Sequence, residues 1–421
     1  MDYDFARLDF SDDSDEAVAR RKAWLGAVSR GFHGGRPDEE YEKRWIDHAR
    51  ADGVVCTGAW LPEGEFGAGH MPVATFASFD KTLNAGLELI PLRMITDVTT
   101  SPAHRRRGLV RRLMEDDLAD AVAKGIPMAA LTASEATIYG RWGFGGATFV
   151  VRLEVDTGPR FGLRSFDDPG RVELIEPPDS WPTVKDVFDR FHATTRGSVD
   201  WPQFYEVLHT GTYDFENGPD KKLRGVVHLD GDGTVDGVAL YKHDGRDGDK
   251  RKVKVTEMMA LTPTAGLALW QFLGGIDLVN HVSFEPAHPD DPLKWALTDM
   301  NAVRQTKVEE FLWLRVLDVE RSLAARPWTA DDRVVLQVDD PLGHAAGSYA
   351  VETGDGRAKV ASTDEPADVR VDCETLGSLY LGAAHVSTLR RAGRIGGTDE
   401  AVDRFAAMAD LAVPPYNITG F

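Results

Sequence analysis

The sequence contains 421 residues, 42% of them hydrophobic and 28% charged, which is ordinary for globular proteins and excludes a globally disordered chain. This length is enough for roughly two to four domains, each with its own core. The formal net charge of −20 argues against a nucleic-acid partner, because phosphates require a basic face, and favours either cationic partners or a role in solubility alone.

The first 155 residues predict helices followed by a mixed sheet. Residues 1–50 have the polar pattern of helices, with Trp24 and Trp45 among the inward-facing anchors. Further along, apolar runs and alternation predict strands at 54–61, 72–79, 87–99, 128–132 and 143–151, and helices from Leu109 to a stop at Gly125 and over 135–139. This order is typical of a mixed α/β sheet, and the residues that follow, 152–170, predict a linker.

Two further segments follow the linker. Residues 171–317 repeat the first order in degenerate form, with strands at 225–229, 235–242, 253–261 and 281–284 and a helix within LTPTAGLALWQFL. This copy lacks the Arg-rich turn found in the first. Residues 318–421 predict strands at 334–338, 347–351 and 369–373, and helices near 375–384 and 398–409.

The turn before Leu109 carries the strongest chemical signal. Its sequence, SPAHRRRG, and the next residues place five arginines in a short stretch of an acidic chain. The first N–H groups of a helix lack partners inside the helix and favour a bound anion. Gly108 lets a phosphate approach the backbone, and arginines oppose the helix dipole unless an anion such as pyrophosphate is present. The competing interpretation is a solvated basic surface cluster.

At these residues the chain resembles GNAT acetyltransferases, and more specifically the Eis family. The run from Arg105 to Val110 is similar to the (Gln/Arg)-x-x-Gly-x-(Gly/Ala) pyrophosphate loop, although Val110 departs from its last position. The strings HRRRGLVRRLM and TASEATIYGRWGFGGAT are similar to those of Eis proteins. The resemblance implies an α/β (α+β) fold with a catalytic GNAT domain at 1–155, a degenerate GNAT-like domain at 171–317 and a sterol-carrier-protein-like domain at 318–421. It also implies a homo-hexamer.

The same resemblance implies the site residues of an acetyl-CoA-dependent N-acetyltransferase. Tyr139 is expected to be the general acid, and the C-terminal carboxylate of Phe421 the general base. Trp45 is expected to line the amine pocket, with a core position as the alternative. Acetyl-CoA contacts are expected from Val98, Thr99, Thr100, Arg106, Arg107, Gly108, Leu109, Val110, Arg111, Ser134 and Glu135.

Both catalytic assignments fit acyl transfer from a thioester to an amine. A departing thiolate titrates near ~8.5 and tyrosine near ~10, so a positioned tyrosine can donate the proton at modest cost. A carboxylate can take a proton from the amine and attract a cationic substrate. The tail after Asp410 has no charged side chain and is stiffened by Pro414 and Pro415, which favours burial. The competing interpretations are a packing aromatic at Tyr139 and a frayed terminus at Phe421.

Three functions remain open at this point. An aminoglycoside-type N-acetyltransferase fits the acidic balance, acetylation of lysine side chains on proteins or peptides fits the same motif, and a lipid-binding carrier protein would place the function in the third segment. No metal is expected, because Cys56 and Cys373 lie far apart and the histidines lack ligand spacing. The acidic N-terminus and the lack of a long apolar run predict a cytoplasmic protein without a membrane span.

Overall fold

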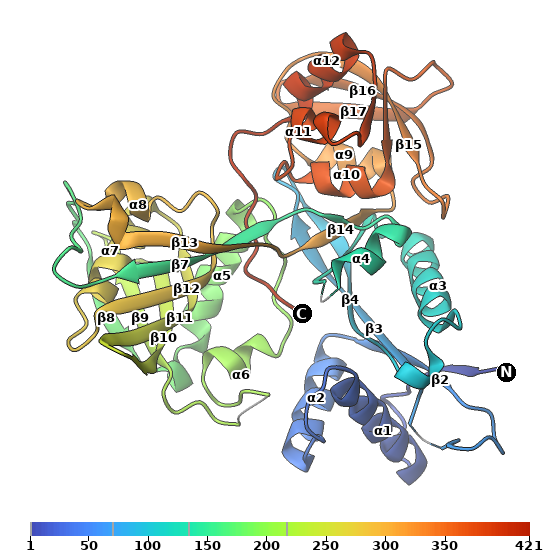
Figure 1. The fold of residues 1–421 in the computed structure, drawn as a ribbon, viewed down its shortest axis with the longest axis horizontal. Helices are drawn as coiled ribbons and strands as arrows, with labels where there is room; N and C mark the ends of the chain where they lie inside the picture. Colours follow the sequence, from blue (N-terminus) through green and yellow to red (C-terminus); the bar gives the residue numbers. More distant parts are fainter. Residues whose placement is uncertain (1, 70, 134, 216–217) are drawn as a thin grey trace.

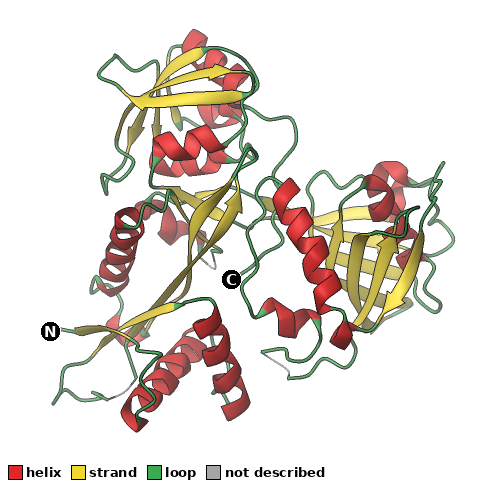
Figure 2. Cartoon of the chain, turned by 180° about the vertical axis from the view of Figure 1, so that it is seen from behind, coloured by secondary structure: helices red, strands yellow, loops and turns green. Residues whose placement is uncertain are grey.

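The structure, a computed structural model, describes residues 2–69, 71–133, 135–215 and 218–421. Within these ranges the chain forms three lobes, each built on one β-sheet with helices packed against it (Figures 1 and 2). The first two sheets have seven described strands each and the third has five. The mixed α/β class expected from the sequence is therefore confirmed.

The first sheet has the strand order β1-β2-β3-β4-β5-β14-β6. One helix of this lobe, α3, packs its buried Leu109, Leu113 and Leu118 against Phe76 and Ile95 of the sheet. The elements are β1 (Asp4–Arg7), α1 (Asp15–Gly31), α2 (Glu39–Ala51), β2 (Val55–Trp60), β3 (Ala74–Asn84), β4 (Leu89–Thr100), α3 (Leu109–Ala123), β5 (Met128–Leu131), α4 (Ala136–Tyr139), β6 (Gly145–Gly146) and β14 (Trp313–Val316).

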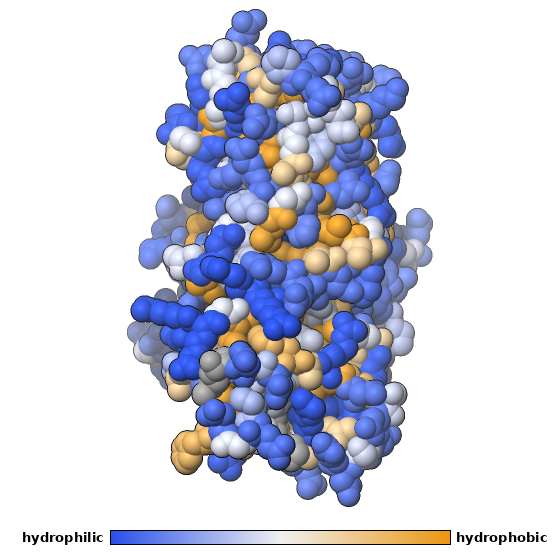
Figure 3. Space-filling model, turned by 90° about the vertical axis from the view of Figure 1, so that its right-hand side faces the viewer, coloured by the Kyte–Doolittle hydropathy of each residue, from blue (hydrophilic) through white to orange (hydrophobic). Residues whose placement is uncertain are grey.

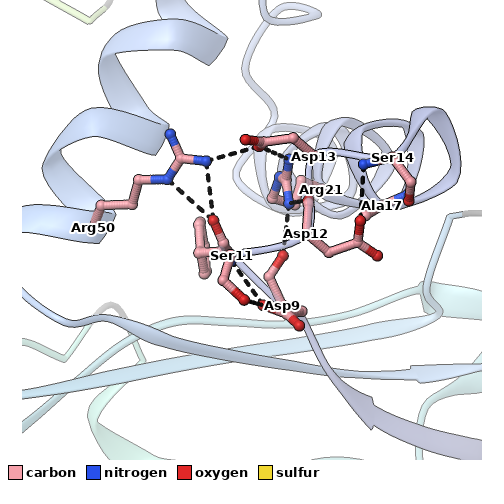
Figure 4. Close-up of polar contacts among 9 residues, drawn as sticks. Asp9, Ser11, Asp12, Asp13, Ser14, Ala17, Arg21 and Arg50 are labelled. Atoms are coloured by element: carbon pink, nitrogen blue, oxygen red, sulfur yellow. Dashed lines mark hydrogen bonds and ion pairs between the residues drawn. The ribbon is translucent and has the colours of Figure 1, made fainter.

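The connection from β1 to α1 is held by two arginines (Figure 4). Arg21, on α1, donates hydrogen bonds of 2.6 and 2.5 Å to the main-chain oxygens of Asp9 and Asp12. Arg50, on α2, donates bonds of 3.0 Å to the main-chain oxygen of Phe10 and to the carboxylate of Asp13. These contacts fix both helices relative to β1. This strand was not predicted, because residues 1–50 were expected to be helical.

The second sheet has the order β13-β7-β12-β11-β10-β9-β8. Four of its strands, β9 to β12, were predicted, as was the helix that follows β11, whereas β8 and β13 were not predicted. The elements are β7 (Phe149–Asp156), β8 (Arg171–Ile175), α5 (Trp181–Thr194), α6 (Tyr205–His209), β9 (Arg224–Leu229), β10 (Val235–Asp247), β11 (Lys250–Ala260), α7 (Pro263–Gly274), β12 (His281–Ala287), α8 (Leu293–Ala296) and β13 (Val303–Glu310).

The first two sheets exchange strands. The expected closing strand at 143–151 is wrong, because only the short strand β6 from this stretch belongs to the first sheet. The strand β14, which follows the second sheet's last strand in the sequence, lies between β5 and β6. The strand β7 instead pairs with β12 and β13, so the expected linker at 152–170 is wrong over its first residues. Val151, Leu153 and Val155 alternate along β7 and are buried in the second core, which explains why this segment is a strand.

The third lobe docks directly on the first. Its sheet has the order β17-β16-β15-β18-β19. One continuous apolar core joins residues such as Met94 and Leu314 of the first sheet to Tyr380 and Phe405 of the third lobe. The elements are α9 (Val319–Ala325), β15 (Arg333–Asp339), β16 (Gly347–Gly354), β17 (Arg357–Ser362), β18 (Val369–Asp372), α10 (Cys373–Tyr380), α11 (Val386–Arg391), β19 (Ile395–Gly397) and α12 (Asp399–Ala409).

The face shown in Figure 3 is mostly hydrophilic, interrupted by small apolar areas. The large apolar side chains that the structure exposes lie on separate elements, such as Leu174 on β8, Trp295 on α8 and Val308 on β13. Among the described residues, none of the helices is both long enough and apolar enough to cross a bilayer.

Candidate active site

The parallel strands β4 and β5 separate near the centre of the first sheet. They pair as far as Ile95 opposite Leu131, and β4 then continues to Thr100 paired only with β3. A bulge in β4 at this point leaves Asp97 with a φ of 53°. Crevices outside the carboxyl ends of parallel strands are the usual ligand sites of α/β sheets. A cavity of about 540 Å³ opens there, lined by β4, β5, α4, the end of β13 and Phe421.

Tyr139, the last residue of α4, lies in the wall of this cavity with 5% of its surface exposed. Its ring packs against those of Trp142 and Phe144, with centroids 6.2 and 6.4 Å away. Burial raises the pKa of the Tyr139 hydroxyl, and the charge of Glu135 raises it further. The hydroxyl is therefore protonated at neutral pH, which is the state that a general acid requires.

The tail of the chain passes from the third lobe to a position between the first two lobes (Figure 1). Its last residue, Phe421, lines the same cavity. The hydroxyl of Thr132 donates a hydrogen bond of 2.6 Å to the main-chain oxygen of Phe421. The ring of Phe421 packs edge-on against Phe79, with centroids 6.3 Å apart. The N–H of Gly420 donates a bond of 2.7 Å to the hydroxyl of Tyr205, on α6. The end of the chain is thus held by both of the first two lobes.

Acidic side chains line this cavity, and none of its described lining residues is Lys, Arg or His. Asp97, Glu309 and Glu310 contribute three carboxylates. Burial raises the pKa of Asp97 to about 6, and in the part of the chain that the structure describes no hydrogen bond or ion pair reaches its carboxylate. Glu309 is paired with Lys307 at 2.5 Å. The cavity therefore favours a positively charged occupant.

The turn between β4 and α3 contains two left-handed residues. Gly108, immediately before α3, has a φ of 76°, and Arg106 has a φ of 62°. A Cβ placed on Gly108 would have no neighbour within 4 Å, so the approach to the first turn of α3 is open. Arg106, Arg107 and Arg111 are exposed around it, and Arg107 donates a bond of 2.9 Å to the hydroxyl of Tyr3. Open helix N–H groups surrounded by guanidinium groups fit a pyrophosphate.

The position of α3 is set by Arg93, a residue of β4 with 2% of its surface exposed. Its guanidinium donates to the carboxylates of Asp80, Asp117 and Asp120, at 2.5, 2.8 and 3.1 Å. Two of these acceptors lie on α3 and one on β3. This buried cluster ties the helix to the strand that carries the cavity, so the basic turn and the cavity keep a fixed spacing.

The structure places the expected acetyl-CoA contacts on adjacent elements. Val98 lines the cavity, and Thr99 and Thr100 follow it along β4. Leu109 is buried against the sheet, so only its backbone faces the turn, and Val110 is half-buried. Glu135 is exposed beside α4, whereas Ser134 lies outside the described residues.

Trp45 is not among the described residues that line the cavity. Its ring stacks on Trp24, with centroids 5.4 Å apart, and tilts against Phe10 at 5.8 Å. The ring therefore contributes to a small apolar cluster beneath α1 and α2.

Several cavity residues were missed by sequence reasoning. Asp97 had a local signal, since it is an acidic residue near the end of the predicted strand at 87–99. Glu309 and Glu310 had none, because they reach the cavity only through the exchange that brings β14 into the first sheet.

Comparison with known protein families identifies three regions along the chain. Two family profiles described as "Acetyltransferase (GNAT) domain" match residues 19–147 and 197–316, and one described as "Sterol carrier protein domain" matches 319–417. An uncharacterized N-acetyltransferase of Streptomyces avermitilis is 34% identical over 388 residues, which cover 90% of this chain and 91% of the relative. The N-acetyltransferase Eis of Mycobacterium tuberculosis is 34% identical over 352 residues, which cover 81% of this chain and 84% of the relative.

The chain belongs to the Eis family of GNAT N-acetyltransferases. The crystal structure of Eis1 from Mycobacterium abscessus superposes on it with a TM-score of 0.82 and 27% identity, over the whole of both chains. The predicted family, the tandem GNAT arrangement with a carrier-like third region, and the acetyl-transferring activity are therefore confirmed.

Two features of this Eis protein concern metals and thiols. Across the described ranges, no group of three or more His, Cys, Asp or Glu side chains could hold a metal ion. Cys56 and Cys373 are both buried free thiols.

Proposed function

We propose that the protein transfers the acetyl group of acetyl-CoA to an amine of a cationic substrate, with aminoglycosides as the substrate class. The observation that carries the proposal is the cavity at the end of β5, which is lined by a protonated tyrosine and a group of carboxylates and, among the described residues, by no basic side chain. The basic turn before α3 supports acetyl-CoA as the donor. When bound, acetyl-CoA supplies a thioester whose sulfur leaves as a thiolate.

Gly108 and the arginines of the turn are expected to hold the pyrophosphate. Val98, Thr99 and Thr100, in the part of β4 that has left β5, are expected to hold the chain that leads to the thioester. Ser134 and Glu135 complete the proposed contacts.

Tyr139 is the proposed general acid. Its hydroxyl is protonated at neutral pH and can give that proton to the departing sulfur. The terminal carboxylate of Phe421 is the proposed general base, oriented by the hydroxyl of Thr132. This carboxylate takes the proton that the substrate ammonium must lose, and Asp97 attracts that ammonium into the cavity.

A thiol-release assay with acetyl-CoA tests the substrate class. We expect turnover with aminoglycosides and spermidine, and a much higher KM for butylamine, which carries one charge instead of several. Turnover with lysine peptides alone would favour the second candidate, acetylation of protein lysines. No turnover with any of these amines would contradict the proposed substrate class.

A C-terminal extension tests the base. Adding residues after Phe421 converts its carboxylate into an amide, which cannot accept the proton. Activity is expected to be lost while acetyl-CoA binding and thermal unfolding remain, and the same tag at the N-terminus is expected to leave activity intact. Normal turnover of the C-terminally extended protein would assign the base to another group, such as Asp97.

The family resemblance also leads us to propose a cytoplasmic homo-hexamer. Sedimentation velocity at micromolar concentration is expected to give a single hexameric species, and a monomer or dimer would contradict the proposal.

A further inference from the structure

A second cavity occupies the equivalent place in the second sheet. The parallel strands β11 and β12 pair as far as Val255 opposite Phe284, and β11 then continues to Ala260, paired only with β10, before α7 begins. This repeats the geometry of β4, β5 and α3. A cavity of about 590 Å³ opens where the two strands separate. Here α7 is capped by Thr262, whose hydroxyl accepts a bond of 3.1 Å from the N–H of Ala265, and no arginines stand in the turn.

The wall of this second cavity is largely apolar. Leu267 and Trp270 line it from α7, Phe191 from α5 and Phe284 from β12. Apolar walls with a few polar groups are the usual composition of small-molecule sites, where the apolar part supplies affinity and the polar groups orient the ligand. Without basic side chains at the helix start, this cavity is not suited to a pyrophosphate.

One carboxylate in the wall lacks a cationic partner. A side-chain oxygen of Asp291 accepts a hydrogen bond of 2.9 Å from the N–H of Leu293. Burial raises the pKa of Asp291 to about 6, so the group is charged at neutral pH. Among the described residues, no ion pair involves it. A partly desolvated carboxylate of this kind gains from a cation beside it.

The two basic residues of this cavity are already engaged with the tail of the chain. Arg196 donates hydrogen bonds to the main-chain oxygens of Leu381, at 3.0 Å, and of Val413. The ring of His288 packs edge-on against Tyr416, with centroids 5.0 Å apart, and burial lowers the pKa of His288, which favours the neutral form. Neither residue forms a salt bridge with Asp291.

We propose that this second cavity binds an organic cation with an apolar body. The charged head lies at the carboxylate of Asp291, and the apolar part lies against Trp270 and Phe284. The site is separate from the acetyl-transfer cavity, since the two share no lining residue. The proposal does not depend on which amine the enzyme acetylates.

The probe is octyltrimethylammonium, which has an apolar chain and a fixed positive charge and cannot accept an acetyl group. Titration calorimetry with the full-length protein, saturated with acetyl-CoA, is expected to show a saturable binding event. Octanol and octyl sulfate share the chain but carry no charge or the opposite charge, and are expected to bind at least about tenfold more weakly. Equal binding of all three compounds would overturn the role of Asp291.

Two variants test whether octyltrimethylammonium binds in this second cavity. Asp291→Asn keeps the acceptor for Leu293 but removes the charge, and is expected to weaken binding about tenfold or more. Leu267→Trp fills the cavity and is expected to abolish binding. Asp97→Asn, in the first cavity, is the matched control and is expected to leave the event unchanged. Should Leu267→Trp fail to fold, Asp291→Asn decides alone: full affinity in that variant would overturn the proposal.

Discussion

Thr132 and Phe421 lie 289 positions apart in the sequence, yet the hydroxyl of Thr132 donates a hydrogen bond of 2.6 Å to the main-chain oxygen of Phe421. The donor stands immediately after β5, where that strand separates from β4. The acceptor belongs to a tail that has crossed from the third lobe (Figure 1). This one contact joins the wall of the cavity to the proposed base.

Removing this contact is expected to impair catalysis more than binding. A hydrogen bond to a charged group is worth ~1.5–3 kcal/mol, so Thr132→Val should lower kcat about tenfold or more. The KM for acetyl-CoA should not change, and Thr132→Ser, which keeps the hydroxyl, should retain activity. Steady-state kinetics of the wild type and the two variants measure this. A wild-type kcat for Thr132→Val would contradict the role of Phe421 as the general base.

Tyr139→Phe removes only the hydroxyl of the proposed acid. Loss of a positioned acid typically costs ~10²–10⁴ in rate, so kcat should fall by that factor with unchanged acetyl-CoA affinity. Because burial raises the pKa of Tyr139, the wild-type hydroxyl stays protonated up to alkaline pH. The wild-type rate should therefore show no loss attributable to this group between neutral pH and ~10. A pH–rate profile of the wild type checks this. Unimpaired turnover of Tyr139→Phe would show that Tyr139 serves only in packing.

Substitution of Gly108 is expected to weaken acetyl-CoA binding. Gly108→Val places a side chain where the pyrophosphate is expected to approach, and its φ of 76° also strains any non-glycine residue by ~1–3 kcal/mol. Gly125, at the other end of α3, has a φ of 68° and an equally open position, so Gly125→Val imposes a similar strain far from the turn. Calorimetry should show weaker binding only for Gly108→Val. Equal affinities in both variants would contradict the pyrophosphate assignment.

Asp97 is expected to make substrate binding pH-dependent. Its pKa of about 6 means that the carboxylate is charged above that pH and protonated below it. The KM for a polyamine should therefore rise as the pH falls through 6, whereas Asp97→Asn should have a high KM with no change over that range. Since burial penalises the charged form, the variant should also unfold at a higher temperature. A pH-independent KM in the wild type would exclude Asp97 from substrate attraction.

A buried ion pair links the first sheet to the third lobe. Arg315, on β14, and Asp340, after β15, lie 2.6 Å apart with both side chains fully buried. Burial alone would raise the pKa of Asp340, but the N–H of Ala345, the guanidinium of Arg315 and the N–H of Leu342 together lower it. A lowered folded-state pKa means that the pair stabilises the protein above the unfolded value of ~3.9, and that this contribution is lost as the pH falls through the folded value.

Breaking this pair should be costly. Asp340→Asn leaves the charge of Arg315 buried and should reduce the free energy of unfolding by ~3–5 kcal/mol at neutral pH. Combining Arg315→Met with Asp340→Leu should recover much of that loss, because no charge then stays buried. Urea unfolding of these proteins at neutral and acidic pH is the measurement. A difference between wild type and Asp340→Asn that does not shrink in acid would contradict the assigned role.

Sequence reasoning recovered what is encoded locally. The helix from Leu109 was predicted because its apolar residues repeat with the helical period and Gly125 ends it, and the turn before it was recognisable from its arginines. The strand exchange was not predictable, because nothing near Trp313 shows that its partner Leu131 lies in another segment. The short strand β1 was missed because it is too brief to show a pattern and is stabilised by pairing with β2.

The exchange of β7 and β14 has a consequence for biosynthesis. Until the ribosome has made β14, the nascent first sheet has an open β5 edge, with unpaired N–H and C=O groups that can recruit other chains. Closing that edge requires a contact across nearly the whole second segment, which is slow because a long loop must be ordered first. A gene cut after residue 155 would make this exposure permanent, so the first lobe is expected to aggregate when expressed alone and to become soluble when β14 is supplied.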